Sequence, residues 1–593
     1  MRAMTALKLP LGKLRKRRKE EIRFTTECKL PYHEDGRPWY LEEYIAKVRE
    51  KYGEPEFVDK IPGRYKFERK FNLIYPVGGG IFIHALSERT EGGYARYIVI
   101  EPPRPPEHLL RKAEELIAER IPEGYIPKSA QEKACMLLEL VKISFEGKGR
   151  GGKSGRRSGR LRLGLKLPSK KPSASVALQA DYPRPEELLN AVIYHIVRDK
   201  ISVGILEPFI RDPYIEDISC SGLGNIFIIH KIFGPMESNV GFKDHDELNA
   251  FLIALAEKIG KPLSNARPIV DATLPDGSRI NIVYGTDVSL RGSNFTIRKV
   301  SKTPLSVTQL INWGTFDARV AAYMWMLLRE GMSGFICGET ASGKTTSLTA
   351  LLVFIRPSAK IVSIEDTAEV IVPHPNWTRE LTRDTGKKES SVTMFDLLKA
   401  ALRQRPNYII VGEIRGAEGN IAFQAMQTGH PVLSTFHAAD IDRLIQRLTN
   451  NPINVPKTNL DSLNFAWFQS AVYTKQGFLA RRMIKLYELI GYDPSSDSIL
   501  AVPVFVWEPS TDKFIFSGRG ASYLLEEKIA VMKGIPRSRI KEIYDELELR
   551  RAFLEELIRR KVFNYWDVWK AVVKADELGI EEALKRLREG RLL

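Results

Sequence analysis

Residues 335–346, FICGETASGKTT, constrain the fold of this chain more than any other stretch. A short apolar run ends in GETASGKT, which matches the pattern G-x-x-x-x-G-K-[ST]. Glycines let such a loop curl so that its backbone N–H groups point at phosphate oxygens, and the following helix directs its positive end at the same anion. The pattern predicts a phosphate-binding loop between a buried strand at 332–337 and a helix at 346–355.

The same loop predicts a nucleotide and its metal ion. Lys344 is placed to reach the β- and γ-phosphates, and the Thr345 hydroxyl is placed to bind Mg²⁺. The predicted cofactors are therefore ATP and Mg²⁺, and the predicted binding residues are Gly338, Glu339, Thr340, Ala341, Ser342, Gly343, Lys344, Thr345 and Thr346.

Length and composition indicate a soluble protein of several domains. The chain has 593 residues, which is too long for one hydrophobic core, and 43% of them are hydrophobic and 27% charged. No apolar run approaches the roughly 18 residues that span a bilayer, and the N-terminus lacks the apolar core of a signal peptide. A cytoplasmic location is expected. The four cysteines include no C-x-x-C pair, so a zinc site is not expected.

The net charge of +17 is concentrated in two segments. Residues 1–19 carry eight Lys or Arg and residues 147–171 carry ten, and neither segment contains an acidic residue. The rest of the chain is therefore close to neutral. Basic segments on a neutral body suit an anionic membrane surface or an acidic partner, whereas a nucleic-acid-binding domain more often carries its charge on a folded face. Solvated segments without a specific partner are the alternative.

Pattern and composition divide the chain into six parts. They are a basic tail (1–28), an α+β domain (29–146), a Gly/Ser-rich basic linker (147–182), a second α+β domain (183–300), a P-loop domain (301–498) and a hairpin with a helical C-terminal module (499–593). Alternating signals in the P-loop domain predict a mostly parallel sheet covered on both faces. Its strands are expected at 334–337, 360–364, 408–411 and 431–435, and its helices include 393–404 and 420–428.

Polar residues follow three of these predicted strands. Glu365 and Asp366 follow the second strand, Glu413 follows the third and His437 follows the fourth. Ligands of an open α/β sheet bind at the carboxyl ends of its strands, so these side chains should converge on Lys344 and Thr345. Glu413, expected at the strand beside the loop, is predicted to hold a Mg²⁺-bound water. Glu365 is predicted to orient or deprotonate the attacking water, and His437 to contact the γ-phosphate.

The positive group that phosphoryl transfer gains from is not evident within this domain. Such a group is often supplied in trans. Arg279 and Arg298 lie on adjacent predicted strands of the second domain. We therefore expect them to reach the nucleotide of a neighbouring subunit, although they can equally be surface charges.

Four segments resemble the Walker A motif, Asp box, Walker B motif and His box of the type II/type IV secretion ATPase superfamily, in that order. They are GETASGKTT (338–346), IVSIEDTAEV (361–370), ALRQRPNYIIVGEIRGAE (401–418) and QAMQTGHPVLSTFHAAD (424–440). LPDGSR and FTIRK, which contain Arg279 and Arg298, resemble the segments that carry the family's trans-acting arginines. The likeness covers about residues 183–493 and is closest to the archaeal members, which lack the four-cysteine zinc module of bacterial ones.

This resemblance implies an α/β fold class: a P-loop, RecA-like parallel sheet with an α+β N-terminal domain, an additional N-terminal α/β module and a helical C-terminal module. It implies a ring-shaped homo-hexamer that hydrolyses ATP at the cytoplasmic face of the cell membrane. Motion about a hinge at 300–315 would drive a polytopic membrane platform protein that assembles a pilus, an archaellum or a secretion apparatus. The basic linker matches nothing in the family.

Two alternatives belong to other classes. One is a nucleic-acid translocase, since hexameric P-loop motors also move DNA; against it, no folded segment interleaves basic and aromatic residues. The other is an ATP-binding regulatory subunit without turnover, which the set of Lys344, Glu365, Glu413 and His437 does not favour.

Overall fold

The computed structural model describes residues 37–592 except 67, 69, 122–128, 146–181, 301–302, 384–388 and 475–478. The chain divides into two compact units, Met1–Lys299 and Val300–Leu593. The predicted tail (1–28) and all but the last residue of the predicted linker (147–182) lie outside the described residues. In the described part, no helix combines the length and apolar character that crossing a bilayer requires.

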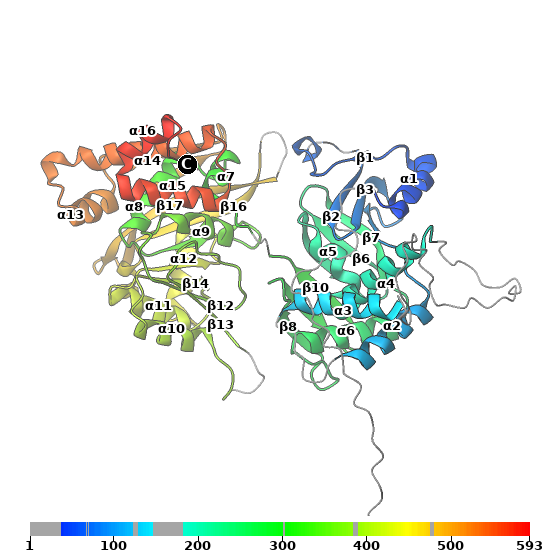
Figure 1. The fold of residues 1–593 in the computed structure, drawn as a ribbon. Coiled ribbons are helices and arrows are strands. Elements are labelled where there is room, and N and C mark those ends of the chain that lie inside the picture. Colours follow the sequence, from blue (N-terminus) through cyan, green and yellow to red (C-terminus); the bar gives the residue numbers. More distant parts are fainter. Residues whose placement is uncertain are drawn as a thin grey trace, which may run out of the picture. The chain divides into compact units, whose positions relative to one another are not determined.

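In its described residues, the first unit is built on a ten-stranded sheet of order β1-β2-β3-β4-β7-β6-β5-β10-β9-β8 (Figure 1). Neighbouring strands are antiparallel except in the pairs β1–β2 and β4–β7. The strands are β1 (Glu56–Phe57), β2 (Asn72–Gly78), β3 (Ile81–Arg89), β4 (Ala95–Ile100), β5 (Ile215–Cys220), β6 (Gly224–His230), β7 (Gly234–Phe242), β8 (Ile269–Thr273), β9 (Arg279–Val283) and β10 (Asn294–Arg298).

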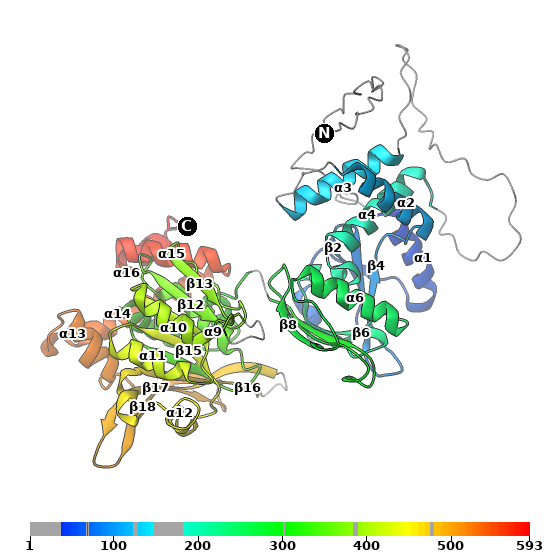
Figure 2. The same ribbon diagram turned by 90° about the horizontal axis from the view of Figure 1, so that it is seen from below.

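The helices of this unit form two groups. Three of them pack together through Leu110, Leu140, Val192 and other apolar residues, and they lie side by side in Figure 2: α2 (Glu107–Arg120), α3 (Ala130–Phe145) and α4 (Pro185–Lys200). The others pack on the sheet: α1 (Trp39–Tyr52), α5 (Glu207–Arg211) and α6 (His245–Lys258).

The structure joins the two predicted domains 29–146 and 183–300 into one unit. Strand β4 of the first pairs in parallel with β7 of the second, and helix α4 of the second packs on α2 and α3 of the first. Separated, each half-sheet would present an unpaired edge strand to water. The segment predicted as an interdomain linker therefore connects two helices of one unit.

Within its described residues, the second unit contains a nine-stranded sheet of order β13-β12-β14-β15-β11-β16-β17-β18-β19. The first six strands are mutually parallel and the last four form antiparallel pairs. The strands are β11 (Gly334–Cys337), β12 (Ile361–Glu365), β13 (Trp377–Leu381), β14 (Tyr408–Glu413), β15 (Val432–Phe436), β16 (Phe465–Tyr473), β17 (Leu479–Asp493), β18 (Ser498–Glu508) and β19 (Lys513–Phe516).

Helices cover both faces of the parallel part, as the alternating signals predict. In β11, Phe335 and Cys337 face one core and Ile336 faces the other, because successive side chains of a strand point to opposite faces. The face of Phe335 is covered by α10 (Met394–Arg403), α11 (Glu418–Gln427) and α12 (Ile441–Thr449). The face of Ile336 is covered by α7 (Val307–Asn312), α8 (Ala318–Arg329) and α9 (Lys344–Leu351).

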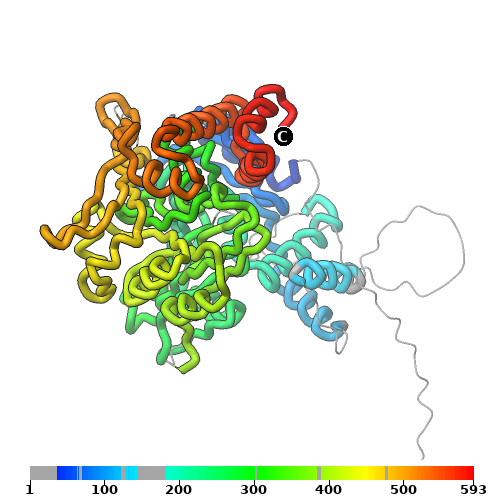
Figure 3. The backbone as a smooth tube through the Cα atoms, turned by 90° about the vertical axis from the view of Figure 1, so that its left-hand side faces the viewer, coloured from blue at the N-terminus to red at the C-terminus, as the bar shows by residue number. Residues whose placement is uncertain are grey.

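The C-terminal module shares this second core instead of forming a separate one. Its helices are α13 (Ala530–Met532), α14 (Lys541–Arg559), α15 (Tyr565–Leu578) and α16 (Ile580–Arg588), shown in orange to red in Figure 3. Trp325 of α8 stacks on Phe354 at 5.0 Å between ring centroids and meets Phe553 of α14 edge-on at 5.8 Å. The predicted hairpin at 499–517 is β18–β19, and β18 pairs with β17 across the predicted boundary at 498/499.

A buried carboxylate fastens this module to the sheet. Glu488 of β17 accepts hydrogen bonds from Ser522 Oγ at 2.5 Å, Tyr523 N at 2.8 Å and the Tyr323 hydroxyl. Glu488→Ala leaves these donors without their acceptor, so we expect the free energy of unfolding to fall by about 3 kcal/mol. Urea denaturation measures the change. Glu577→Ala, at an exposed site on α15, is the control, and equal stability of the two variants would contradict the fastening role.

Candidate nucleotide site

The predicted phosphate loop links β11 to α9, as the motif requires. Gly343 has φ +88°, a left-handed conformation that favours glycine. A Cβ at Gly338 would lie 2.2 Å from the backbone oxygen of Gln469, so only glycine fits there. Lys344 begins α9, which places the helix N-terminus and its N–H groups at the loop. This geometry fits a nucleotide phosphate, and Thr345 at the next position of the helix fits the role of a Mg²⁺ ligand.

Lys344 is buried inside the curl of the loop. Its ammonium donates to the carbonyl oxygens of Gly338 at 2.9 Å and Glu339 at 2.7 Å. Its positive charge also acts on His437, at the end of the neighbouring strand β15. The predicted convergence of Lys344 and His437 at the carboxyl edge of the sheet is therefore present.

Glu413 lies in contact with the same histidine. His437 Nε2 is 2.8 Å from Glu413 Oε1, although that oxygen accepts no well-aligned hydrogen bond, and Glu413 Oε2 accepts one from Arg415. Burial lowers the pKa of His437; the charge of Glu413 opposes this shift, and Lys344 adds to it. The neutral imidazole is thereby favoured.

One detail of the prediction for Glu413 is corrected. The strand beside the loop strand β11 is β15, not β14, so Glu413 is one strand farther away than expected. A register shift between Val411 and Glu413 marks an irregularity at Gly412, where the strand ends. Such bulges re-aim a side chain, and Glu413 meets His437 across the strand boundary.

Glu365 is the most buried acid of the site. Its Oε1 accepts the backbone N–H groups of Glu369 at 2.9 Å and Val370 at 2.7 Å, and its Oε2 accepts Arg379 Nε at 3.2 Å. Burial raises the pKa of Glu365, while these N–H donors and the Arg379 charge act against the rise. A Cβ at Gly412 would lie 3.2 Å from Glu365 Cγ, so this glycine gives the carboxylate its space next to β14.

Other predicted residues are placed less centrally. Asp366 is exposed and accepts a hydrogen bond from the Thr382 hydroxyl at 3.0 Å. Arg279 and Arg298 lie in the first unit, directly opposite each other on β9 and β10. Like charges at such positions repel, so the pair is costly without an anion. Asp217 faces Arg298 from the other side, on β5.

Sequence patterns did not identify Gln469, which holds the loop from β16. This buried amide donates to Ser342 O at 2.7 Å and accepts from Ser347 Oγ at 2.8 Å and Trp467 Nε1 at 3.1 Å. It therefore connects the loop with the first turn of α9. The only sequence signal is one glutamine within the apolar run FAWFQ, and its partner lies more than a hundred residues away.

Gln469→Leu is expected to weaken ATP binding about tenfold, because it removes the loop's hydrogen bonds and leaves three polar groups unpaired, at about 1–3 kcal/mol each. Titration with a fluorescent ATP analogue measures the affinity. Ser347→Ala, which removes only one of the three bonds, is expected to have a smaller effect. Unchanged affinity in Gln469→Leu would show that the amide does not set the loop's shape.

A parallel sheet with a glycine loop, a helix N-terminus, a lysine and acids at its carboxyl edge defines a P-loop nucleotide-binding fold. Residues 199–463 match the family described as "Type II/IV secretion system protein". The uncharacterized protein MJ0900 of Methanocaldococcus jannaschii is 47% identical over 555 residues, which are 91% of this chain and 96% of that protein. The chain belongs to the type II/IV secretion system protein family.

More distant similarities include a named protein and a solved structure. Protein VirB11 of Agrobacterium tumefaciens is 27% identical over 266 residues, which cover 40% of this chain and 77% of VirB11. The X-ray structure of the Legionella pneumophila ATPase DotB matches 65% of this chain and 94% of its own, with 18% identity and a TM-score of 0.36.

Proposed function

We propose that this protein is an ATP hydrolase that works as a homo-hexameric motor. Its task is to power assembly of a type IV pilus-like filament, such as a pilus or an archaellum, or of a secretion apparatus. The observation that carries the proposal is the meeting of Lys344, Glu413 and His437 at the carboxyl edge of the sheet, beside a buried Glu365. Membership of the type II/IV secretion system protein family supports the biological role.

The residues divide the chemistry among themselves. Loop N–H groups and Lys344 bind the phosphates, and Mg²⁺, held by Thr345 and through water by Glu413, supplies charge neutralisation when bound. Glu365 accepts a proton from the attacking water, since one lone pair of Oε2 remains after the bond from Arg379. His437, neutral at Nε2 or donating from it, hydrogen-bonds the γ-phosphate. Arg279 and Arg298 of a neighbouring subunit stabilise the charge that develops in the transition state.

The partner in this proposal is a polytopic membrane platform protein at the cytoplasmic face of the cell membrane. The basic segments 1–19 and 147–171 would add contact with anionic lipid, because clustered Lys and Arg are attracted to such surfaces. Nucleic acid is not the proposed cargo.

Phosphate release by the purified chain, recorded together with its mass in solution, tests the proposal. We expect slow turnover by a hexamer, loss of turnover in Lys344→Ala, and unchanged turnover in Lys399→Ala, an exposed lysine on α10. ATP binding without phosphate release would favour the regulatory-subunit alternative. Stimulation by DNA but not by anionic vesicles would favour a nucleic-acid translocase.

A further inference from the structure

A cavity of about 1300 Å³ lies within the first unit, at the carboxyl ends of the parallel strands β4 and β7. The ladder between these strands ends at Tyr97 and Ser238. Beyond it, the side-chain amide of Asn239 accepts from Val99 N at 2.8 Å and donates to Val99 O at 3.1 Å. Because a side chain takes over the backbone pairing, the strands separate and leave space between α1, α4 and α6.

Aromatic side chains form part of the cavity wall. Phe242 and Phe251 pack with ring centroids 5.3 Å apart, and Tyr40 and Tyr44 of α1 line another part. The cavity is larger than most small-molecule sites, which hold about 300–1000 Å³. Such walls suit a ligand with a flat, apolar body.

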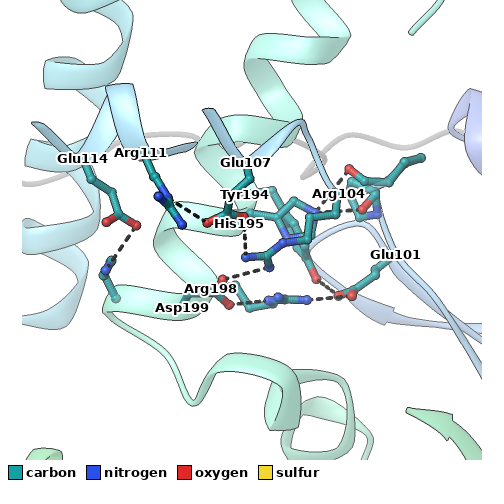
Figure 4. Close-up of polar contacts among 12 residues, drawn as sticks. Glu101, Arg104, Glu107, Arg111, Glu114, Tyr194, His195, Arg198 and Asp199 are labelled. Carbon is teal, nitrogen blue, oxygen red and sulfur yellow. Dashed lines mark hydrogen bonds and ion pairs between the residues drawn. The ribbon is translucent and has the colours of Figure 1, made fainter. Parts of the chain in front are cut away.

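A saturated ion cluster gives this wall a fixed shape (Figure 4). Arg198, whose side chain is 5% exposed, donates to Glu101 Oε1 at 2.6 Å and to Asp199 Oδ1 at 2.8 Å. The second oxygen of Glu101 accepts the Tyr194 hydroxyl at 2.7 Å, and Arg104 lies 3.3 Å from Asp199. Glu101 has both oxygens engaged, so Arg198 serves the wall and is not the group that recognises an anion.

Next to this cluster, His195 has an acceptor that the described residues leave unpaired. Its Nε2 lies 2.9 Å from Pro102 O and 3.2 Å from Pro103 O, which assigns the proton to Nε2. Burial lowers the pKa of His195, so Nδ1 is a buried acceptor, and it has no partner in the part of the chain that the structure describes. Unpaired buried acceptors are rare and are typical of sites that bind a further molecule.

Two lysines face the cavity without forming an ion pair to any residue that the structure describes. They are Lys133 of α3 and Lys258 of α6, and Lys258 donates to the backbone oxygen of Ser202. Burial lowers the pKa of Lys258 and the charge of Lys133 lowers it further, so the two ammonium groups repel each other. A dianion between them would remove this repulsion, and a phosphate monoester carries about −1.5 to −2 charges at pH 7.

We propose that this cavity binds an aromatic phosphate monoester, with its phosphate held by Lys133 and Lys258 and its ring against Phe242 and Phe251. Lysine binds phosphate as a point charge, which suits two ammonium groups arriving from different helices. The site belongs to the first unit and does not depend on the P-loop or on the proposed motor function.

Calorimetric titration of the full chain with phenyl phosphate tests the site. The Lys344→Ala background is used so that the P-loop does not contribute. Inorganic phosphate, which has the anion alone, and phenol, which has the ring alone, are each expected to bind at least tenfold more weakly than phenyl phosphate. Absence of saturable binding at millimolar phenyl phosphate would overturn the proposal, as would equal binding of phenol.

Lysine variants decide which groups hold the phosphate. Lys133→Met and Lys258→Met keep the aliphatic stems and are each expected to weaken phenyl phosphate binding at least tenfold, whereas Lys133→Arg keeps the charge and should bind as the parent does. Lys47→Met is the matched control, because Lys47 lies at the cavity rim in an exposed ion pair with Glu43. If Lys47→Met weakens binding as much as the other two, the assigned anion site is wrong.

Discussion

Glu365→Gln is expected to lower ATP turnover by about 10²–10⁴-fold, the usual contribution of a general base, while ATP binding is retained. The amide keeps the size of the side chain but cannot take a proton from water. Single-turnover phosphate release and nucleotide titration separate the two effects. Glu389→Gln, at an exposed position of the same unit, is the control. Turnover within threefold of wild type in Glu365→Gln would remove this residue from the mechanism.

The pH dependence provides a second measurement of the same role. Because burial raises the pKa of Glu365, the base is lost as pH falls through a value above that of an ordinary glutamate, and kcat/KM should fall with it. Arg379→Ala removes a charge that lowers this pKa, so the acid limb should move to higher pH. An acid limb at the same pH in both proteins would assign it to another group.

Arg279→Ala and Arg298→Ala are each expected to lower turnover by about 10³-fold, the lower end of what a trans-acting arginine contributes. Both side chains are exposed, and removing one of two opposed like charges should not destabilise the sheet. Loss of activity at unchanged melting temperature is therefore the expected combination. Arg267→Ala, an exposed arginine just before β8, is the control.

Mixing two inactive variants distinguishes action in trans from action in cis. In a mixed oligomer of Lys344→Ala and Arg279→Ala, some interfaces combine an intact loop with an intact arginine. Partial recovery of phosphate release is expected if the arginine serves its neighbour. An active Arg279→Ala variant, or a mixture as inactive as its components, would contradict the shared site.

The part of the site that could be predicted from sequence is the part encoded locally. The loop spacing fixes Lys344, and apolar runs of four to six residues locate β12, β14 and β15 with their terminal polar residues. Parallel strands bring their carboxyl ends to one edge, so the meeting of Glu413 and His437 follows from topology. The order of the strands does not follow from it, and Glu413 was consequently placed one strand too close to the loop.

Features that depend on distant pairings were beyond the sequence. Gln469 holds the loop only because β16 lies beside β11, and nothing near Gln469 specifies that neighbour. The pairing of β4 with β7 joins segments on either side of a long basic stretch, which by composition alone indicates a boundary. Arg379 pairs with Glu365 across β13 and β12, again through strand order.

The packing of the C-terminal helices has a consequence for how the protein is made. Leu584, Leu587 and Leu592 are buried in the core that also encloses Ile336 and Leu348 around the loop. During synthesis, the sheet that carries the P-loop therefore has one uncovered apolar face until residues up to 592 have emerged. The first unit, complete by Lys299, can fold on its own schedule. Competence to bind nucleotide is thus among the last properties that the growing chain acquires.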